Sequence, residues 1–193
     1  MSEPTTSPPQ EQVASNAAEQ KVEQSASEVE AQINAGKASI FKAPHQITTS
    51  TPSIFLAGSI EMGKAVDWQT EITKNLCHLP VTIMNPRRDD WDNDWKQDIS
   101  DPRFKEQVVW ELDCQDRADV IAMNFDKKTM SPITLMELGL YAGSGKLVVA
   151  CPDGYWRRGN VQVVCDRFGI ELLESLDELI ENVKGKLEAK VKE

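Results

Sequence analysis

The chain has 193 residues, of which 31 are acidic and 21 are basic, so its formal net charge at pH 7 is −10. This acidic balance argues against broad binding to nucleic-acid polymers or anionic membranes, because both carry negative charge. The length fits one domain plus a tail, and no apolar run approaches the roughly 20 residues that span a bilayer.

The first 44 residues differ from the rest in composition. They are rich in Ser, Thr, Pro, Gln, Glu and Ala, and no aromatic residue precedes Phe41. Such a segment buries too little apolar surface to offset its ordering entropy. We therefore predict a disordered low-complexity tail over residues 1–48 and a folded domain over residues 49–193. Apolar residues at loose helical intervals leave open a helix that forms transiently or on a partner.

From residue 53 onward, short apolar runs alternate with helical patterns. Strands are predicted at residues 53–57, 81–84, 119–124, 146–150 and 170–173. Helices are predicted at about residues 65–77, 102–117, 132–144, 159–167 and 175–187. In the first helix, Val66, Ile72 and Leu76 are expected to face inward. Two helices have clear start signals, which are Asp101 followed by Pro102, and the capping box of Ser175 and Glu178.

Strands that alternate with helices are typical of a parallel sheet covered on both faces. Five strands favour a flavodoxin-like, doubly wound α/β fold in three layers, with the strand order 2-1-3-4-5. Ligands of such sheets bind beyond the carboxyl ends of the strands, at the switch point. By this rule, the loops that follow Ala57, Met84 and Asn124 lie at the same edge of the sheet, and we expect the functional residues there.

One carboxylate stands alone in an apolar segment. Glu137 is the only charged residue between Ser131 and Gly145. Burying a carboxylate costs free energy unless it is partnered or used in chemistry. Glu137 lies too deep in the predicted helix to cap its N-terminus, because Ser131 and Pro132 already supply that start.

A second carboxylate is less conspicuous. Gln107, Glu111 and Gln115 lie one turn apart on one face of the helix that precedes the third strand. Taken alone, a solvated helix face is the better interpretation of this pattern. Glu111 is nevertheless a candidate partner for Glu137.

The two earlier loops offer binding groups with equally good structural interpretations. Gly58 and Ser59 can bring backbone N–H groups to an anion or a sugar, or can simply form a tight turn. The arginines after Asn85-Pro86 can steer an anion or pair with nearby aspartates. The tryptophans of this loop can stack a base or pin the loop to the domain. These side chains are Arg87, Arg88, Trp91 and Trp95.

Taken together and in order, these segments resemble the nucleoside 2-deoxyribosyltransferase family. The resemblance covers about Ser53 to Glu171. It is carried by the run 54–60, by Asn85-Pro86-Arg87-Arg88, by Trp110-Glu111 and by the segment 131–139. The chain looks most like the branch that has a Ser-Pro-Ile-Thr segment and a Gly-Tyr-Trp-Arg segment, here Gly154-Tyr155-Trp156-Arg157.

The resemblance implies an enzyme that cleaves or transfers the N-glycosidic bond of a (deoxy)nucleoside or nucleotide. Glu137 takes the place of the family nucleophile, and Glu111 that of its acid/base aspartate. A carboxylate can trap the positive charge that develops at C1′, and a protonated carboxyl can donate to the departing base. The substrate-binding residues are expected to be Gly58, Ser59, Asn85, Arg87, Trp91, Ser131, Arg157 and Asn160.

Three positions depart from the family pattern. Ser131 stands where the family has a sugar-binding aspartate, and Glu111 is one methylene longer than aspartate. Glu61 follows Ile60, where a related branch has the arginine of a 5′-phosphate loop. These departures leave open a binding module of the same fold without turnover, and also an inert scaffold whose tail recruits partners.

Several further expectations concern partners and location. No metal-ligand spacing is present and the chemistry needs no metal, so no cofactor is expected. The four widely spaced cysteines are expected to be reduced. The N-terminus lacks the basic and apolar regions of a secretory signal, which predicts a cytoplasmic protein. The predicted partners are a small nucleoside or nucleotide and further copies of the chain, as is common in the family.

Overall fold

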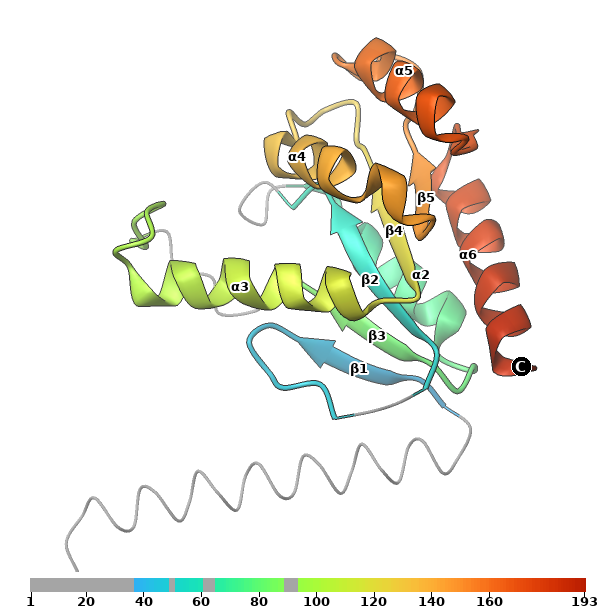
Figure 1. The fold of residues 1–193 in the computed structure, drawn as a ribbon, viewed down its shortest axis with the longest axis horizontal. Coiled ribbons are helices and arrows are strands. Elements are labelled where there is room, and N and C mark those ends of the chain that lie inside the picture. The colour runs from blue at the N-terminus through green and yellow to red at the C-terminus, as the bar shows by residue number, and fades with distance from the viewer. Residues whose placement is uncertain (1–36, 49–50, 61–64, 89–93) are drawn as a thin grey trace, which may run out of the picture.

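The computed structural model describes residues 37–48, 51–60, 65–88 and 94–193. Its centre is a single sheet in which every neighbouring pair of strands is parallel, in the order β1-β3-β2-β4-β5-β6 (Figure 1). The strands are β1 (Ser39–Lys42), β2 (Ser53–Gly58), β3 (Thr82–Asn85), β4 (Val120–Asn124), β5 (Leu147–Ala150) and β6 (Leu172–Leu173).

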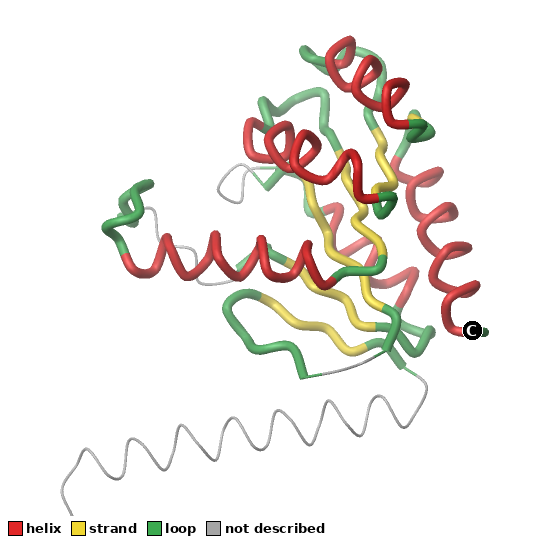
Figure 2. Tube along the Cα trace, in the orientation of Figure 1, coloured by secondary structure: helices red, strands yellow, loops and turns green. Residues whose placement is uncertain are grey.

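The helices lie close to their predicted positions. The structure has helices α2 (Trp68–Leu76), α3 (Pro102–Arg117), α4 (Pro132–Tyr141), the short 3₁₀ turn η2 (Ala142–Ser144), α5 (Arg158–Phe168) and α6 (Leu176–Val191). From β2 onward, strands and helices alternate along the chain, as Figure 2 shows. The Asp101 side chain accepts the N–H of Arg103, and the Ser175 hydroxyl accepts that of Glu178, so both predicted start signals cap their helices.

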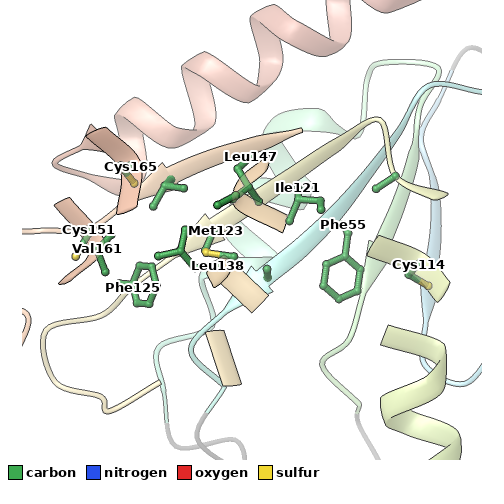
Figure 3. Close-up of a cluster of buried hydrophobic side chains, with 14 of the residues drawn as sticks. Phe55, Cys114, Ile121, Met123, Phe125, Leu138, Leu147, Cys151, Val161 and Cys165 are labelled. Carbon is green, nitrogen blue, oxygen red and sulfur yellow. The ribbon is translucent and has the colours of Figure 1, made fainter. Parts of the chain in front are cut away.

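The layers follow from alternation along the strands. On β2, Phe55 and Ala57 point to one face, whereas Ile54 and Leu56 point to the other. The first face packs under α3, α4 and α5, and Figure 3 shows part of this cluster. The second face packs under α2 and α6. Both faces of the sheet are therefore covered, which is the predicted three-layer, doubly wound α/β fold.

An additional edge strand was not predicted. The five predicted strands have the expected order 2-1-3-4-5, here β3-β2-β4-β5-β6, but β1 extends the sheet beyond β3. It pairs with β3 from Ser39 opposite Thr82 to Lys42 opposite Asn85. The predicted disordered tail over residues 1–48 is therefore wrong for β1, and residues 1–36 lie outside the described part of the chain.

The first helix is shorter than predicted at its N-terminus. Asp67 caps it by accepting the N–H of Thr70, so the helix begins at Trp68. Val66 therefore precedes the helix and is 65% exposed, which contradicts its predicted inward position. Ile72 and Leu76 are fully buried as predicted.

The topology fixes where a ligand site belongs. The chain passes from β2 to β3 on one side of β2, and then crosses back to β4 on the other side. The direction in which strands are added therefore reverses at β2. The register places Gly58 opposite Asn124 at the carboxyl ends of these two central strands. The loops after β2 and β4 therefore diverge at this edge, which is the switch point of the sheet.

The described residues contain four free cysteines, of which Cys77 is exposed and the other three are buried. None of the helices in the described ranges is long and apolar enough to cross a membrane.

Candidate active site

Two glutamates from different helices lie close to each other, on the face of the sheet that α3 and α4 cover. Glu137 lies in the second turn of α4 and is only 6% exposed. Glu111 lies in the middle of α3, on the face that also carries the buried Gln107 and Gln115. This face is turned into the protein, so the interpretation as a solvated helix face is wrong.

Two amide groups hold the carboxylates. Gln115 donates from Nε2 to Oε1 of Glu137 at 2.8 Å, and the same nitrogen lies 3.3 Å from the backbone oxygen of Glu111. Gln107 donates from Nε2 to Oε1 of Glu111 at 2.8 Å and to the backbone oxygen of Pro86 at 3.1 Å. The pair is thus fixed by side chains from α3, one turn before and one turn after Glu111.

Burial raises the pKa of both carboxyls. For Glu111, burial raises the pKa to about 7 against the opposing effect of the Gln107 hydrogen bond. For Glu137, burial and then the nearby charge of Glu111 raise the pKa to about 8, against the Gln115 hydrogen bond. The pair therefore retains at least one proton at neutral pH, which suits chemistry that needs one acid and one carboxylate.

Gly58 allows the closest backbone approach at the switch point. A Cβ at this position would lie 2.6 Å from the backbone oxygen of Asn124 and 2.7 Å from the Trp68 ring, at a φ of +155°. No other residue fits there without a shift of the sheet or the ring. After Gly58 the chain stays beside β4, because the Ser59 N–H donates a hydrogen bond to the Asn124 backbone oxygen.

Three buried hydroxyls form a closed cluster next to this point. The Oγ of Ser59 lies 2.7 Å from Oγ1 of Thr129 and 2.5 Å from Oγ of Ser131, and the last two are 2.7 Å apart. The N–H of Asp126 also donates to the Ser59 hydroxyl. The structure thus brings the predicted Ser59 and Ser131 together and adds Thr129.

Ser131 has an unusual backbone. Its φ of 46° is in the left-handed region, and its side chain makes no capping bond to α4, contrary to the predicted start signal. The carbonyl of the preceding Met130 accepts from the Tyr155 hydroxyl at 2.9 Å and from Nε1 of Trp156 at 3.1 Å. These two bonds help to hold a conformation that costs about 1–3 kcal/mol in a residue other than glycine.

The loop after β3 supports the site from the side of α2. Asn85 is buried and accepts the N–H of Arg87 with its side-chain oxygen. Arg87 approaches Gln69, the backbone oxygen of Ala65 and, at 3.9 Å, a carboxylate oxygen of Asp67. This arginine contacts groups of the protein, and its role in binding substrate stays a prediction.

Arg88 and Trp95 connect the same loop to α3. Arg88 approaches the Gln107 side-chain oxygen at 3.5 Å, and its guanidinium carbon lies 4.8 Å from the centre of the Trp95 ring. Trp95 is 7% exposed, so it pins the loop to the domain. Trp91 was predicted to stack a base, and it lies outside the described residues.

Arg157 and Asn160 are the predicted binding residues farthest from the carboxyl pair. Both are exposed at the start of α5, which lies beyond α4 as seen from α3 (Figure 1). The Arg157 guanidinium lies 4.2 Å from the centre of the Trp156 ring. Within the described ranges, no hydrogen bond joins either residue to Glu111 or Glu137, and the role of both residues in binding substrate stays a prediction.

A cavity of about 600 Å³ flanks α3 on its other side, towards the segment that follows β1. Ile47, Trp110, Asp113 and Arg117 are among its lining residues. Neither Glu111 nor Glu137 is among the residues that line this cavity, and burial raises the pKa of its thiol, Cys114, to about 12. The groups suited to proton transfer therefore lie at the carboxyl pair and not in this cavity.

The site contains residues that the sequence prediction did not include. Gln107 and Gln115 were recognised on the Glu111 face but were not assigned to the site. Their spacing of four residues on either side of Glu111 was the available signal. Thr129 had no such signal, because its contact with Ser59 spans 70 residues of sequence.

Comparisons with known proteins concern the family and the fold of the chain. The family model described as nucleoside 2-deoxyribosyltransferase like matches residues 51–155. A solved structure, described as a conserved protein from Enterococcus faecalis V583, is similar in fold with a TM-score of 0.52 and 12% sequence identity. The similarity covers 71% of this chain and 99% of that one. No curated protein matches the chain.

Proposed function

The chain belongs to the nucleoside 2-deoxyribosyltransferase-like family, and from this we propose that it cleaves the N-glycosidic bond of a (deoxy)nucleoside or nucleotide. The family supports a nucleoside-related role. The further step rests on one observation, which is the pair of the partly buried Glu111 and the buried Glu137, with the pKa of both carboxyls raised. Two carboxyl groups placed together inside a protein lower its stability considerably, so a purely structural role does not account for them.

In the proposed reaction, the Glu137 carboxylate attacks C1′ and forms a glycosyl ester. The C1′–N bond breaks, and its electron pair leaves with the base, which takes the proton of Glu111. Water or a second base then attacks C1′ and gives a proton back to Glu111, and Glu137 departs as a carboxylate. Water makes the protein a hydrolase, and a second base makes it a transferase.

The charge states need one further consideration. The proposed roles require Glu137 to be ionised and Glu111 to be protonated, whereas burial raises the pKa of both carboxyls. The positive charge that develops at C1′ lies against Glu137 and favours its charged form during the reaction. Meanwhile the departing base, which becomes more basic as the bond breaks, draws the proton from Glu111.

The test is a panel of deoxynucleosides, ribonucleosides and their monophosphates, incubated with the protein and separated by chromatography, with and without a free acceptor base. We expect free base from at least one member, and a new nucleoside if the protein is a transferase. Ligands that raise the melting temperature without any turnover would instead favour a binding module of the same fold. Ser131, where the family has a sugar-binding aspartate, is the observation that favours this second candidate.

The roles of the two glutamates can be separated with a substrate whose base is already cationic, such as an N7-methylated purine deoxynucleoside. Such a base leaves without being protonated. Glu111→Gln should therefore lose about 10²–10⁴-fold activity on the ordinary substrate and much less on the cationic one. Glu137→Gln should lose activity on both. An equal loss on both substrates in Glu111→Gln would contradict its role as the acid.

We also propose that a second copy of the chain covers the exposed face of α4. Ile133, Met136 and Leu140 follow one stripe of this helix and are each more than half exposed. The stripe is uncharged in a chain of net charge −10, so two copies meet here with the least repulsion.

Sedimentation should therefore show a dimer or larger oligomer, which Met136→Asp converts to smaller species. Val66→Asp is the matched control, because Val66 is also exposed but lies just before α2. A parent protein that sediments as a monomer would exclude this interface.

A cytoplasmic location is a further part of the proposal. The four free thiols fit a reducing compartment.

A further inference from the structure

Two glutamines of α3 are arranged around the carboxyl pair in a repeated manner. Gln107 precedes Glu111 by one turn and donates to it, and Gln115 follows by one turn and donates to Glu137 across the gap to α4. Each donor nitrogen lies 2.8 Å from a carboxylate oxygen, and each has a second contact to a backbone oxygen. Both of these donors therefore come from one face of α3.

Of the two glutamines, Gln115 gives the stronger indication of a functional role. It is fully buried, yet its Oε1 has no hydrogen-bond partner among the described residues. A buried amide that serves only packing would be satisfied at both ends, or would be replaced by an apolar side chain of the same size. The bond from its N–H to Glu137 is therefore the feature that accounts for a glutamine at this position.

We propose that Gln115 is a positioning residue that holds the Glu137 carboxylate towards C1′ and favours its ionised form. The inference rests on the proposed function and assigns it a residue that does not touch the substrate. Hydrogen bonds donated to a carboxylate favour the charged form. This bond opposes both burial and the charge of Glu111, which favour the neutral form of Glu137.

Among the residues that the structure describes, no cation is among the groups that shift the pKa of Glu137. Glu111 approaches from α3, and on α4 itself Tyr141 follows one turn later. The Tyr141 hydroxyl bonds Asp116 and the Leu112 carbonyl, and its pKa is raised to about 12, first by burial and then by Asp116, so it stays neutral. The amide of Gln115 is thus the group in the described site that stabilises an ionised Glu137.

Gln107 plays a different part because it is tied to the rest of the protein at two points. It donates to the Pro86 carbonyl, and its own oxygen faces Arg88. These contacts link Glu111 to the loop after β3. The Gln115 side chain donates to Glu137 and, within its own helix, to the Glu111 backbone oxygen. Neither contact is to the loop after β3, so substitution of Gln115 is the cleaner test.

The experiment compares the full-length parent with Gln115→Met, Gln115→Glu and a control, Gln162→Met. Methionine keeps the size of the side chain and removes the donor, whereas glutamate keeps the shape and replaces the N–H group by oxygen. Gln162 is exposed on α5 and makes no contact with the site. The two readouts are kcat and KM for base release, and the titration of the Glu137 carboxyl followed by ¹³C NMR.

We expect both Gln115 variants to lower kcat by about 10- to 100-fold with little change in KM, which corresponds to one charge-assisted hydrogen bond. The Glu137 titration should move to higher pH in both variants and stay unchanged in Gln162→Met. If Gln115→Met does not fold, Gln115→Glu carries the test because it preserves shape.

The outcomes separate this inference from the function it rests on. If the parent releases base but neither Gln115 variant changes kcat or the titration, the positioning role is wrong and the enzyme assignment stands. If the parent turns over no substrate, the proposed function fails, and the NMR titration alone decides whether Gln115 stabilises the ionised carboxylate. A fall in kcat without a shifted titration would also overturn the inference, because that is the result of a merely structural defect.

Discussion

Glu137→Gln is expected to reduce base release by at least about 10³-fold while making the fold more stable at pH 8. The loss of activity follows because an amide cannot form the glycosyl ester. The gain in stability follows because glutamine keeps the size of the side chain and removes a group whose ionisation the buried site opposes. Measuring both effects on one variant separates lost chemistry from lost structure.

The direction of the stability effect comes from proton linkage. Folding raises the pKa of Glu137 from its ordinary 4.5 to about 8, so the folded state holds a proton that the unfolded state has released between these pH values. The parent therefore loses stability as the pH rises from about 5 to 8. We expect Glu137→Gln to exceed the parent by roughly 2–5 kcal/mol at pH 8, and to match it near pH 4.

Urea unfolding at several pH values measures this difference. Glu181→Gln on the exposed surface of α6 is the matched control and should track the parent at every pH. A parent whose stability does not fall between pH 5 and 8 would show that the carboxyl pair is not held with raised pKa values. A Glu137→Gln variant that still releases base would show that Glu137 is not the nucleophile.

Gly58→Ala is expected to destabilise the fold by about 3 kcal/mol or more, because the new methyl group meets the backbone of β4. The contact of 2.6 Å is to the Asn124 carbonyl, which cannot rotate away as a side chain can. The Trp68 ring on the other side lies at 2.7 Å and is itself 2% exposed. The opening of β2 from β4 should also displace Ser59 from the hydroxyl cluster.

Gly185→Ala provides the control for this substitution. Gly185 lies inside α6, and a Cβ there has nothing within 4 Å. Alanine is the better helix former, so this variant should gain about 0.5–1 kcal/mol. Thermal unfolding of both variants is the measurement, and a Gly58→Ala protein as stable as the parent would show that the sheet edge can relax.

The layered α/β fold was predictable because its signals are local. The apolar run of β2, Asp101 before Pro102 and the capping box at Ser175 each determine an element within a few residues. The edge strand β1 was missed because its four residues follow a polar segment and owe their order to pairing with β3. Val66 was misplaced because Asp67 had not been recognised as the cap.

The two carboxylates were predictable for different reasons. Glu137 was recognised as a lone charge in an apolar helix, whereas Glu111 depended on the family resemblance. The sequence offered no way to see that α3 turns Glu111 inward, because that direction depends on packing against β2 through residues such as Trp110. Contacts across the chain, such as Ser59 with Thr129, likewise depend on the fold.

The two hydrogen bonds that the Met130 carbonyl accepts have a consequence for how such a chain changes over evolutionary time. Tyr155 and Trp156 belong to one sequence signature and Ser131 to another, yet the first pair supports the backbone that gives the second its shape. Two motifs that lie some twenty-five residues apart thus form a single inherited unit. A lineage that discards the aromatic pair loses the support for a left-handed serine, and glycine is the residue that can take its place there.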